Sequence, residues 1–279
     1  MTELGGIIGL TQWLQTPAGR YLLAWEQSHL DVVVADLFGY HALQIGLAEL
    51  DALRANRMPH RWVAAVSPEP APEPEPDDGN EAAPRVGVAL YCDFDALPFD
   101  SHSLDLVVLP HALELARDPH LALREVDRVL VPEGRVVIVG FNPASLWGLR
   151  QRLGRLRRRL AAGGAPDLYL PSAGEFIGFR RLRDWLRLLS FEVEAGRFGC
   201  YRPPVVTPKW LKRFAWMDQV GERWWPIFGA VYFVVAVKRV RGMRLVGLVR
   251  EQRSVPKAAP APVGVARHHK DNSHKELHD

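Results

Sequence analysis

Residues 92–141 read CDFDALPFDSHSLDLVVLPHALELARDPHLALREVDRVLVPEGRVVIVGF, and their pattern is the strongest indication of the fold. Within it, residues 104–110 (LDLVVLP) are almost continuously apolar, which is typical of a strand buried on both faces of a parallel sheet. Residues 119–130 predict a helix, because the segment opens with a proline and follows an aspartate that can cap it. Residues 134–141 (GRVVIVGF) predict the next buried strand. Strands that alternate with helices in this way predict a doubly wound α/β fold.

The rest of the chain extends this pattern on both sides. Upstream, apolar residues at three- and four-residue steps predict a helix over 12–37. The segments expected to follow are a turn and strand within 38–46, a helix at 47–57, and strands at 61–66 and 85–94. Downstream, the predicted elements are helices at 146–160 and 175–189 and strands at 191–201 and 231–240. The two late strands are joined by a long connection, which favours an antiparallel edge to the sheet.

Composition favours one globular domain with additions. The chain has 279 residues, of which 48% are apolar, and a net charge of +3. A chain of this kind is long enough to bury a core. The segment at 67–84 is acidic and proline-rich, and the C-terminal stretch lacks apolar periodicity. We therefore expect a domain over 1–250 with an insertion at 67–84, a cap formed by 146–230, and a disordered tail at 251–279.

The same composition argues against several classes of protein. The longest apolar run, 224–237, is interrupted by a proline and a glycine and is too short to cross a bilayer. Residues 1–20 lack the basic start and the long apolar centre of a signal peptide. The two cysteines, Cys92 and Cys200, are far apart, so we expect reduced thiols, no metal site and a cytoplasmic protein. The histidines of the tail are expected to be solvated rather than metal-bound.

The order of features in residues 92–141 resembles the class I S-adenosylmethionine-dependent methyltransferases, in particular the subgroup that methylates quinones and other small molecules. That family has an acidic residue before an LPF loop, a strand of the form fD followed by apolar residues, a helix that ends in RvLkPGG, and a further strand. This chain has all of these in order, with RVLVPEG in place of the last motif. The resemblance implies a mostly parallel seven-stranded sheet with an antiparallel edge strand, and a cofactor at the carboxyl ends of the first strands.

The resemblance also implies which residues hold S-adenosylmethionine. Asp93 matches the acidic residue that accepts a hydrogen bond from the adenine amino group, and a carboxylate suits this role because it only accepts. The backbone N–H of Phe94 would meet a ring nitrogen. Gly46 matches the first glycine of the cofactor turn. Gln44 stands where the family usually has an acidic residue, and its amide can still form hydrogen bonds with the methionyl end.

The turn in HALQIGLAEL (residues 41–50) departs from the family, because Ala48 and Leu50 replace its second and third glycines. The bulky Leu50 requires a rearranged approach of the backbone to the cofactor. Glu69 could contact the ribose, but it lies in the acidic tract, and we favour no role for it. An alternative reading therefore stays open, in which the protein is a catalytically degenerate methyltransferase fold that acts as a binding scaffold.

Two residues are candidates for contact with the acceptor. His111 follows the fourth strand at a position that faces the methyl-transfer site in the family, and a histidine can remove a proton near neutral pH. A structural histidine is the alternative. Asn142 follows the fifth strand, where its amide could orient an acceptor or could cap a turn. Methyl transfer itself needs mainly positioning and desolvation, so no catalytic dyad is required.

Residues 146–160 combine a stripe of leucines with six arginines. We favour a lid helix whose leucines pack on the domain and whose arginines face water; peripheral contact with a membrane through 149–160 is the alternative. The tryptophans of the late region are expected mainly to pack a core. Nucleic acid is not an expected partner, because the arginines are not interleaved with aromatic residues, and an RNA-directed methyltransferase is the weakest of the three functions considered. The expected acceptor is a small or lipophilic molecule, and the sequence leaves the oligomeric state open.

Overall fold

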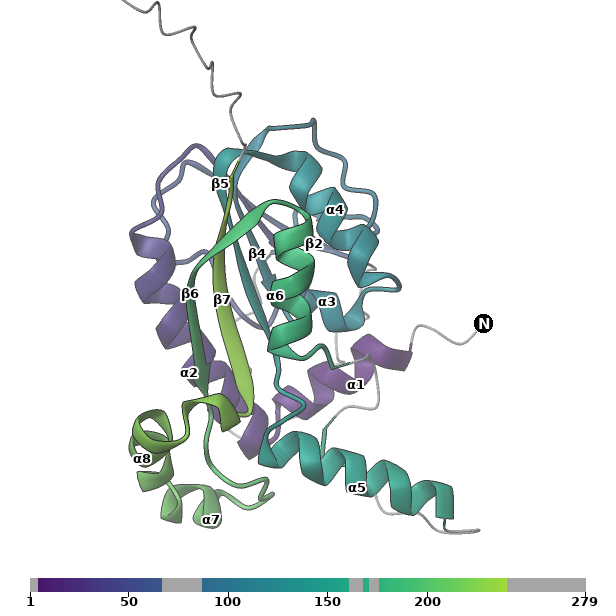
Figure 1. Cartoon of the computed structure of the whole chain (residues 1–279), viewed down its shortest axis with the longest axis vertical. Helices are drawn as coiled ribbons and strands as arrows, with labels where there is room; N and C mark the ends of the chain where they lie inside the picture. The colour runs from purple at the N-terminus through teal and green to yellow at the C-terminus, as the bar shows by residue number, and fades with distance from the viewer. Residues whose placement is uncertain (1–4, 67–86, 161–167, 171–175, 240–279) are drawn as a thin grey trace, which may run out of the picture. The chain divides into compact units, whose positions relative to one another are not determined.

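The computed structural model describes residues 5–66, 87–160, 168–170 and 176–239, and all of them belong to one compact unit, Met1–Arg241. Its centre is a seven-stranded sheet in the order β3-β2-β1-β4-β5-β7-β6 (Figure 1). The strands are β1 (His41–Ile45), β2 (His60–Ala65), β3 (Leu90–Tyr91), β4 (Leu104–Pro110), β5 (Leu130–Phe141), β6 (Phe191–Gly199) and β7 (Val231–Lys238). The predicted doubly wound α/β fold is confirmed.

Strand direction also follows the prediction. The strands β3, β2, β1, β4 and β5 pair in parallel, and β7 runs antiparallel to both β5 and β6. The antiparallel edge is therefore the β6–β7 pair, with β7 as the reversed strand. Since β5 and β6 both oppose β7, the carboxyl ends of β1, β2, β4, β5 and β6 lie at the same edge of the sheet.

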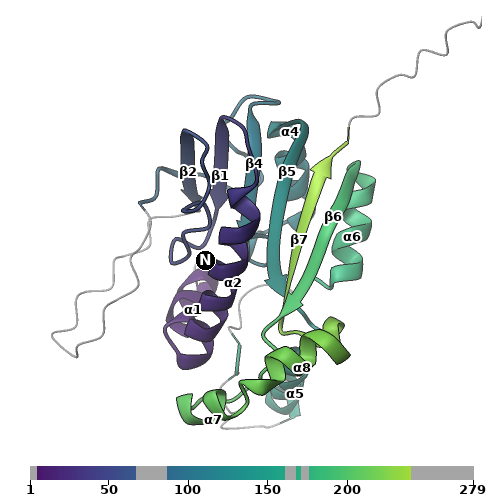
Figure 2. The ribbon, with the colours of Figure 1, turned by 90° about the vertical axis from the view of Figure 1, so that its left-hand side faces the viewer.

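Helices cover both faces of the sheet, because successive residues of each strand point to opposite sides. In β1, Ala42 packs in a core with residues of α1 and α2, whereas Leu43 packs in a second core with residues of α4 and α6. Figure 2 shows α2 and α6 on opposite sides of the sheet. The helices are α1 (Gly5–Leu14), α2 (Pro17–Ala35), α3 (Ala112–Leu115), α4 (Pro119–Val129), α5 (Leu146–Leu160), α6 (Phe179–Leu188), α7 (Pro208–Arg213), α8 (Trp216–Trp224) and the 3₁₀ turn η1 (Pro226–Phe228).

The N-terminal region differs from its prediction. A single helix was expected over 12–37, but the chain forms α1 and α2 with a break between them. Pro17 occupies the first turn of α2, where its missing N–H costs nothing. Thr16 caps the new helix by accepting a hydrogen bond from the backbone N–H of Gly19 at 3.2 Å. Thr16 and Pro17 therefore begin a second helix within a segment whose apolar periodicity predicts one helix.

The main elements predicted within residues 92–141 are confirmed. The almost continuously apolar segment forms β4, and nearly all of its residues are buried. Helix α4 begins where predicted, and the Asp118 carboxylate accepts hydrogen bonds from the backbone N–H groups of His120 and Leu121. The strand predicted at 85–94 is shorter, because β3 pairs with β2 only at two positions. The turn predicted before β5 is instead part of that strand, with Glu133 at a φ of 64°.

The prediction for α5 is wrong in its orientation. Its leucines were expected to pack on the domain, but all five are exposed to between 47% and 77%. Trp147 and Gln151, on the other side of the helix, are buried instead. The late tryptophans were expected mainly to be core, yet the side chains of four are substantially exposed: Trp210, Trp216, Trp224 and Trp225. None of the helices among the described residues is both long and apolar enough to span a membrane.

Candidate functional site

The turn after β1 is built differently from its prediction. Gly46 has a φ of 84° and Leu47 a φ of 30°, and the described chain then forms turns where a helix was predicted over 47–57. The cause is Gln44, which is fully buried. Its amide donates to the backbone oxygens of Leu47 at 2.9 Å and Leu50 at 2.7 Å, and it accepts from the N–H of Ala52 at 2.9 Å. The oxygen of Leu47 also accepts from the backbone N–H of Leu50 at 3.3 Å, so one turn bond and a side chain take the place of a helical ladder.

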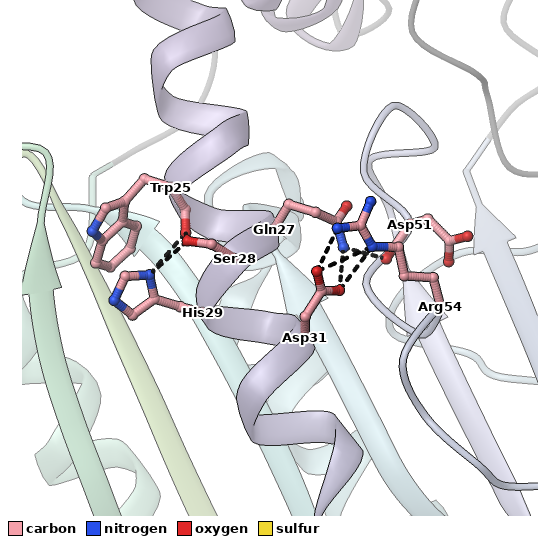
Figure 3. A network of polar contacts seen from close by, with 7 residues as sticks. All are labelled: Trp25, Gln27, Ser28, His29, Asp31, Asp51 and Arg54. Atoms are coloured by element: carbon pink, nitrogen blue, oxygen red, sulfur yellow. Dashed lines mark hydrogen bonds and ion pairs between the residues drawn. The ribbon is translucent and has the colours of Figure 1, made fainter.

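Helix α2 holds the same turn from outside (Figure 3). Gln27 donates to the backbone oxygen of Asp51 at 2.8 Å, and Arg54 donates from Nε to the Asp31 carboxylate at 2.8 Å. On the same helix, the ring of Trp25 stacks on His29 with 4.0 Å between ring centroids. The turn is thus fixed on both sides without a helix of its own.

Gly46 is the point where three loops meet. A Cβ built on it would lie 3.6 Å from the ring of Phe94, 3.5 Å from Cβ of Ala112 and 3.7 Å from the backbone oxygen of Pro110. The structure therefore brings together Gly46, Phe94 and the segment around His111. Because those distances are ordinary contacts, it is the positive φ rather than crowding that favours glycine here.

Asp93 follows β3 and is exposed, whereas the next residue, Phe94, is buried. The backbone oxygen of Asp93 accepts a hydrogen bond from the backbone N–H of Ala96 at 3.2 Å, and this bond closes a turn. Asp93 is therefore accessible at the carboxyl edge of the sheet, and the residue that follows it is buried. Glu69 and the acidic insertion lie outside the described residues.

His111 begins the loop after β4 in the left-handed conformation, with a φ of 54°. Its side chain is fully buried, with Nδ1 2.9 Å from Oε2 of Glu114 and Nε2 2.8 Å from Oε1 of Glu26. Burial alone would lower the pKa of His111, but the Glu26 and Glu114 carboxylates outweigh it and raise the pKa to about 10. The ring is therefore held as an imidazolium. An imidazolium has no free lone pair, so this arrangement argues against the predicted general base.

The two carboxylates of this cluster differ in what they bind. Glu114 accepts a hydrogen bond from the backbone N–H of Phe141 at 2.6 Å, so both of its oxygens are used, and burial raises its pKa. Glu26 uses Oε1 for His111, and its other oxygen, Oε2, is buried without a hydrogen-bond partner among the described residues. A buried carboxylate oxygen without a hydrogen-bond partner is costly unless a donor or a cation binds it.

Asn142 follows β5 and is almost completely buried. Its side-chain nitrogen donates to the backbone oxygens of Ile227 at 2.7 Å and Gly229 at 2.9 Å, and its oxygen accepts from the N–H of Ala144 at 3.1 Å. The amide thus joins the end of β5 to the η1 segment and caps a turn. This favours the turn-capping alternative over contact with an acceptor.

Sequence reasoning missed Glu26. The signal was present, because the buried face of α2 repeats every four residues and one position of that repeat is acidic. The repeat consists of Ala18, Leu22, Glu26, Leu30 and Val34. A lone carboxylate on an otherwise apolar helix face predicts a buried partner, which here is the histidine of a loop far away in sequence.

Comparisons with known proteins agree with this fold. Residues 71–138 match the family described as "Methyltransferase domain". The chain is 37% identical over 54 residues to a demethylmenaquinone methyltransferase of Chlamydia pneumoniae, which is 19% of this chain and 24% of that protein. Among solved structures, a methyltransferase of Haloferax volcanii in complex with the Trm112 methyltransferase activator superposes with a TM-score of 0.56 at 18% identity. That superposition covers 85% of this chain and 99% of the other.

A relative also matches along almost the whole length. The chain is 30% identical over 258 residues to the uncharacterized protein YafS of Escherichia coli (strain K12), and the alignment covers 91% of each protein. The resemblance first seen in residues 92–141 thus extends to a matched family and to the sheet order. The chain therefore belongs to the class I methyltransferase family, with YafS as a relative along nearly its whole length.

Proposed function

We propose that the protein is an S-adenosylmethionine-dependent methyltransferase that acts on a small, lipophilic acceptor. The observation that carries this proposal is the unpartnered Oε2 of Glu26, whose other oxygen contacts the buried ring of His111. That cluster lies next to the cofactor turn, because His111 is flanked by the two residues that contact Gly46.

The residues present fit the charge of this cofactor. S-adenosylmethionine carries two positive groups, an ammonium and a sulfonium, and an unpartnered carboxylate oxygen is a suitable acceptor or counter-charge for either. The family usually supplies an acidic residue at the position of Gln44, whose amide is here bound to the turn. Glu26 would replace that missing carboxylate from α2.

The adenine end has its own candidates. The ring of Phe94 is buried against Gly46, and the exposed carboxylate of Asp93 precedes it. A carboxylate beside an apolar ring is suited to an adenine, which presents both an amino group and a flat face. Asp93 and Phe94 would therefore hold the base, and Gly46 and Glu26 the methionyl end.

S-adenosylmethionine, when bound, supplies a methyl group on a positively charged sulfur. The chain itself has to hold the two reactants in line and exclude water. The surroundings of His111 are apolar, since the centroid of its ring lies 4.4 Å from that of Phe141, which in turn packs against Trp13 and Phe176. The proton of His111 stays between two carboxylates, so this residue positions Glu26 rather than removing a proton from the acceptor.

Calorimetric titration with S-adenosylmethionine and S-adenosylhomocysteine tests the proposal. We expect Glu26→Gln to weaken binding of both ligands about tenfold or more if Oε2 binds the ammonium. A larger loss for S-adenosylmethionine would assign Oε2 to the sulfonium, which S-adenosylhomocysteine lacks. Asp93→Ala should weaken both equally, and Glu194→Gln, an exposed carboxylate on β6 that binds Arg135, is the matched control.

One observation favours a second candidate, the non-catalytic scaffold. The side-chain nitrogens of Gln44 and Asn142 both donate to the protein's own backbone, so neither amide has a donor left for a ligand. The same titration separates the two functions. Absence of heat and of any thermal shift at millimolar ligand would contradict the enzyme and leave the scaffold.

A further inference from the structure

An apolar and basic surface lies at the end of the sheet where α5, α7, α8 and η1 gather. We call it the leucine–tryptophan face. Its apolar members are the exposed side chains Leu146, Leu149, Leu153, Leu156, Leu160, Trp210, Trp216, Trp224, Trp225, Ile227 and Phe228. Water-soluble surfaces rarely gather so many large apolar side chains, and such a patch marks an interaction site.

Both parts of this face lie at the carboxyl edge of the sheet. Helix α5 follows the carboxyl end of β5, and α7, α8 and η1 connect the carboxyl end of β6 to the start of β7. Those ends lie at one edge of the sheet, and Figures 1 and 2 both show α5, α7 and α8 there. The indole nitrogen of Trp147 donates to the backbone oxygen of Arg202 at 2.7 Å, so the side of α5 opposite the leucines is bound to the segment before α7.

Helix α5 is amphipathic, but its apolar stripe faces away from the protein instead of packing on it. The leucines recur at steps of three and four residues, which places them along one side of the helix. Trp147 and Gln151 are buried on the opposite side. Arg152 and Arg157 are exposed and flank the stripe on its two sides. Long basic side chains beside an apolar stripe can extend towards a charged surface while the stripe inserts.

The charge of the face is strongly positive, although the whole chain has a net charge of only +3. Residues 146–160 contain six arginines and no acidic residue. Residues 206–228 add four basic residues against Asp218 and Glu222. Asp218 is already paired with Arg202 at 2.9 Å and accepts a hydrogen bond from Tyr21. The face therefore presents positive charge and apolar side chains together.

We propose that the leucine–tryptophan face docks on the surface of an anionic lipid bilayer, with α5 lying in the plane of the headgroups. A basic helix with an exposed apolar stripe has the composition of an interfacial helix. Tryptophans are suited to the headgroup region because their rings are apolar with one polar N–H. A second copy of the chain would bring two arginine-rich helices together, and phosphates of a nucleic acid would leave the leucines in water.

The position of the face has a consequence for the acceptor. The carboxyl edge of the sheet carries both this face and the candidate site at Gly46, Phe94 and His111. Docking would therefore bring the edge that carries the candidate site to the bilayer, where lipophilic molecules dissolve. This inference goes beyond the proposed function, because vesicle binding requires neither cofactor nor catalysis.

Co-sedimentation of the full chain with vesicles tests the docking. The vesicles are phosphatidylcholine alone and phosphatidylcholine mixed with phosphatidylglycerol. We expect binding to the anionic vesicles, weakened by salt, together with a blue shift of tryptophan emission. The variant Leu149→Gln/Leu153→Gln/Leu156→Gln keeps the charge and should reduce partitioning about tenfold or more. Because these side chains are already exposed, its thermal unfolding should match that of the unaltered protein.

Two further variants make the result specific. Arg152→Gln/Arg157→Gln should weaken binding to anionic vesicles about tenfold or more and leave the weak binding to neutral vesicles unchanged. Leu188→Gln is the matched control, since it alters an exposed leucine that precedes β6 at the opposite edge of the sheet. Failure to sediment with anionic vesicles at low salt would overturn the proposal. So would a dimer in solution that the leucine variant converts to a monomer, because a second copy would then cover the stripe.

Discussion

The Nε2 atom of His111 lies 2.8 Å from Oε1 of Glu26, although the two residues are 85 positions apart in the chain. The contact joins α2 to the loop after β4, and neither side chain is exposed to solvent. Because Glu114 contacts the other ring nitrogen, the imidazolium separates two buried carboxylates. Its positive charge is what makes their burial together tolerable.

Removal of the imidazolium should therefore be more costly than removal of the pair. We expect His111→Gln to lower the free energy of unfolding by about 3–5 kcal/mol, since it leaves two carboxylates buried together. The double variant Glu26→Gln/His111→Gln should recover part of that loss, because one of the two charges is then absent. Urea denaturation of both single variants and the double variant measures the coupling. Strictly additive losses would show that the two side chains do not interact.

The raised pKa of His111 predicts a dependence of stability on pH. Between the pKa of an unfolded histidine, about 6.5, and the folded value of about 10, the folded protein retains a proton that the unfolded chain releases. The stabilisation is therefore complete below about pH 6.5 and is lost as the pH rises through the folded pKa, by up to about 1.4 kcal/mol per pH unit. Burial also raises the pKa of the Cys200 thiol, so denaturation is best compared below pH 8.

The matched measurement uses His111→Gln over the same pH range. Its free energy of unfolding should fall less steeply with pH than that of the unaltered protein. Equal slopes for the two proteins would mean that His111 is neutral in the folded state.

Elements whose own residues determine their structure could be predicted from the sequence, and elements that depend on a side chain from elsewhere could not. Residues 104–141 were predicted well, because β4, α4 and β5 each have a complete apolar pattern, and α4 has its own capping residue. The helix predicted at 47–57 failed although its periodicity was helical. There, Gln44 on the preceding strand captures the backbone oxygens of Leu47 and Leu50. Periodicity does not report a competing side chain from another element.

The candidate site was predictable only in part, for a related reason. Family motifs located Gly46 and Phe94, which do meet in the structure. They did not indicate Glu26, because its partner lies on a distant loop. The leucine repeat of α5 predicted an amphipathic helix but could not show which side packs, and the buried side proved to be that of Trp147 and Gln151.

Restoring the acidic residue that the family usually has on β1 should damage this protein. In Gln44→Glu the new carboxyl would face the backbone oxygens of Leu47 and Leu50 and would lose both donated hydrogen bonds. We expect the free energy of unfolding to fall by about 3 kcal/mol or more at neutral pH, and less in acid, where a protonated carboxyl can donate one bond. Chemical denaturation at the two pH values measures this.

Asp31→Asn is the control for that variant, because it loosens the outside of the same turn. Asp31 pairs with Arg54 at the surface, and both side chains are partly exposed. We expect a loss of only about 0.2–1 kcal/mol. If Asp31→Asn lowered the free energy of unfolding as much as Gln44→Glu does, surface contacts with α2 would hold the turn as strongly as the buried amide of Gln44.

Asn142 should prove to be a structural tie between β5 and η1. Asn142→Ala would leave the backbone oxygens of Ile227 and Gly229 without their buried donor, and we expect a loss of about 1–3 kcal/mol. Hydrogen exchange should accelerate at 226–230, next to the leucine–tryptophan face. The matched control is Asn56→Ala, an equally buried amide that binds the backbone oxygens of Val34 and Leu37. Its effect should stay near the turn after β1, and faster exchange at 226–230 in both variants would mean general destabilisation rather than a local tie.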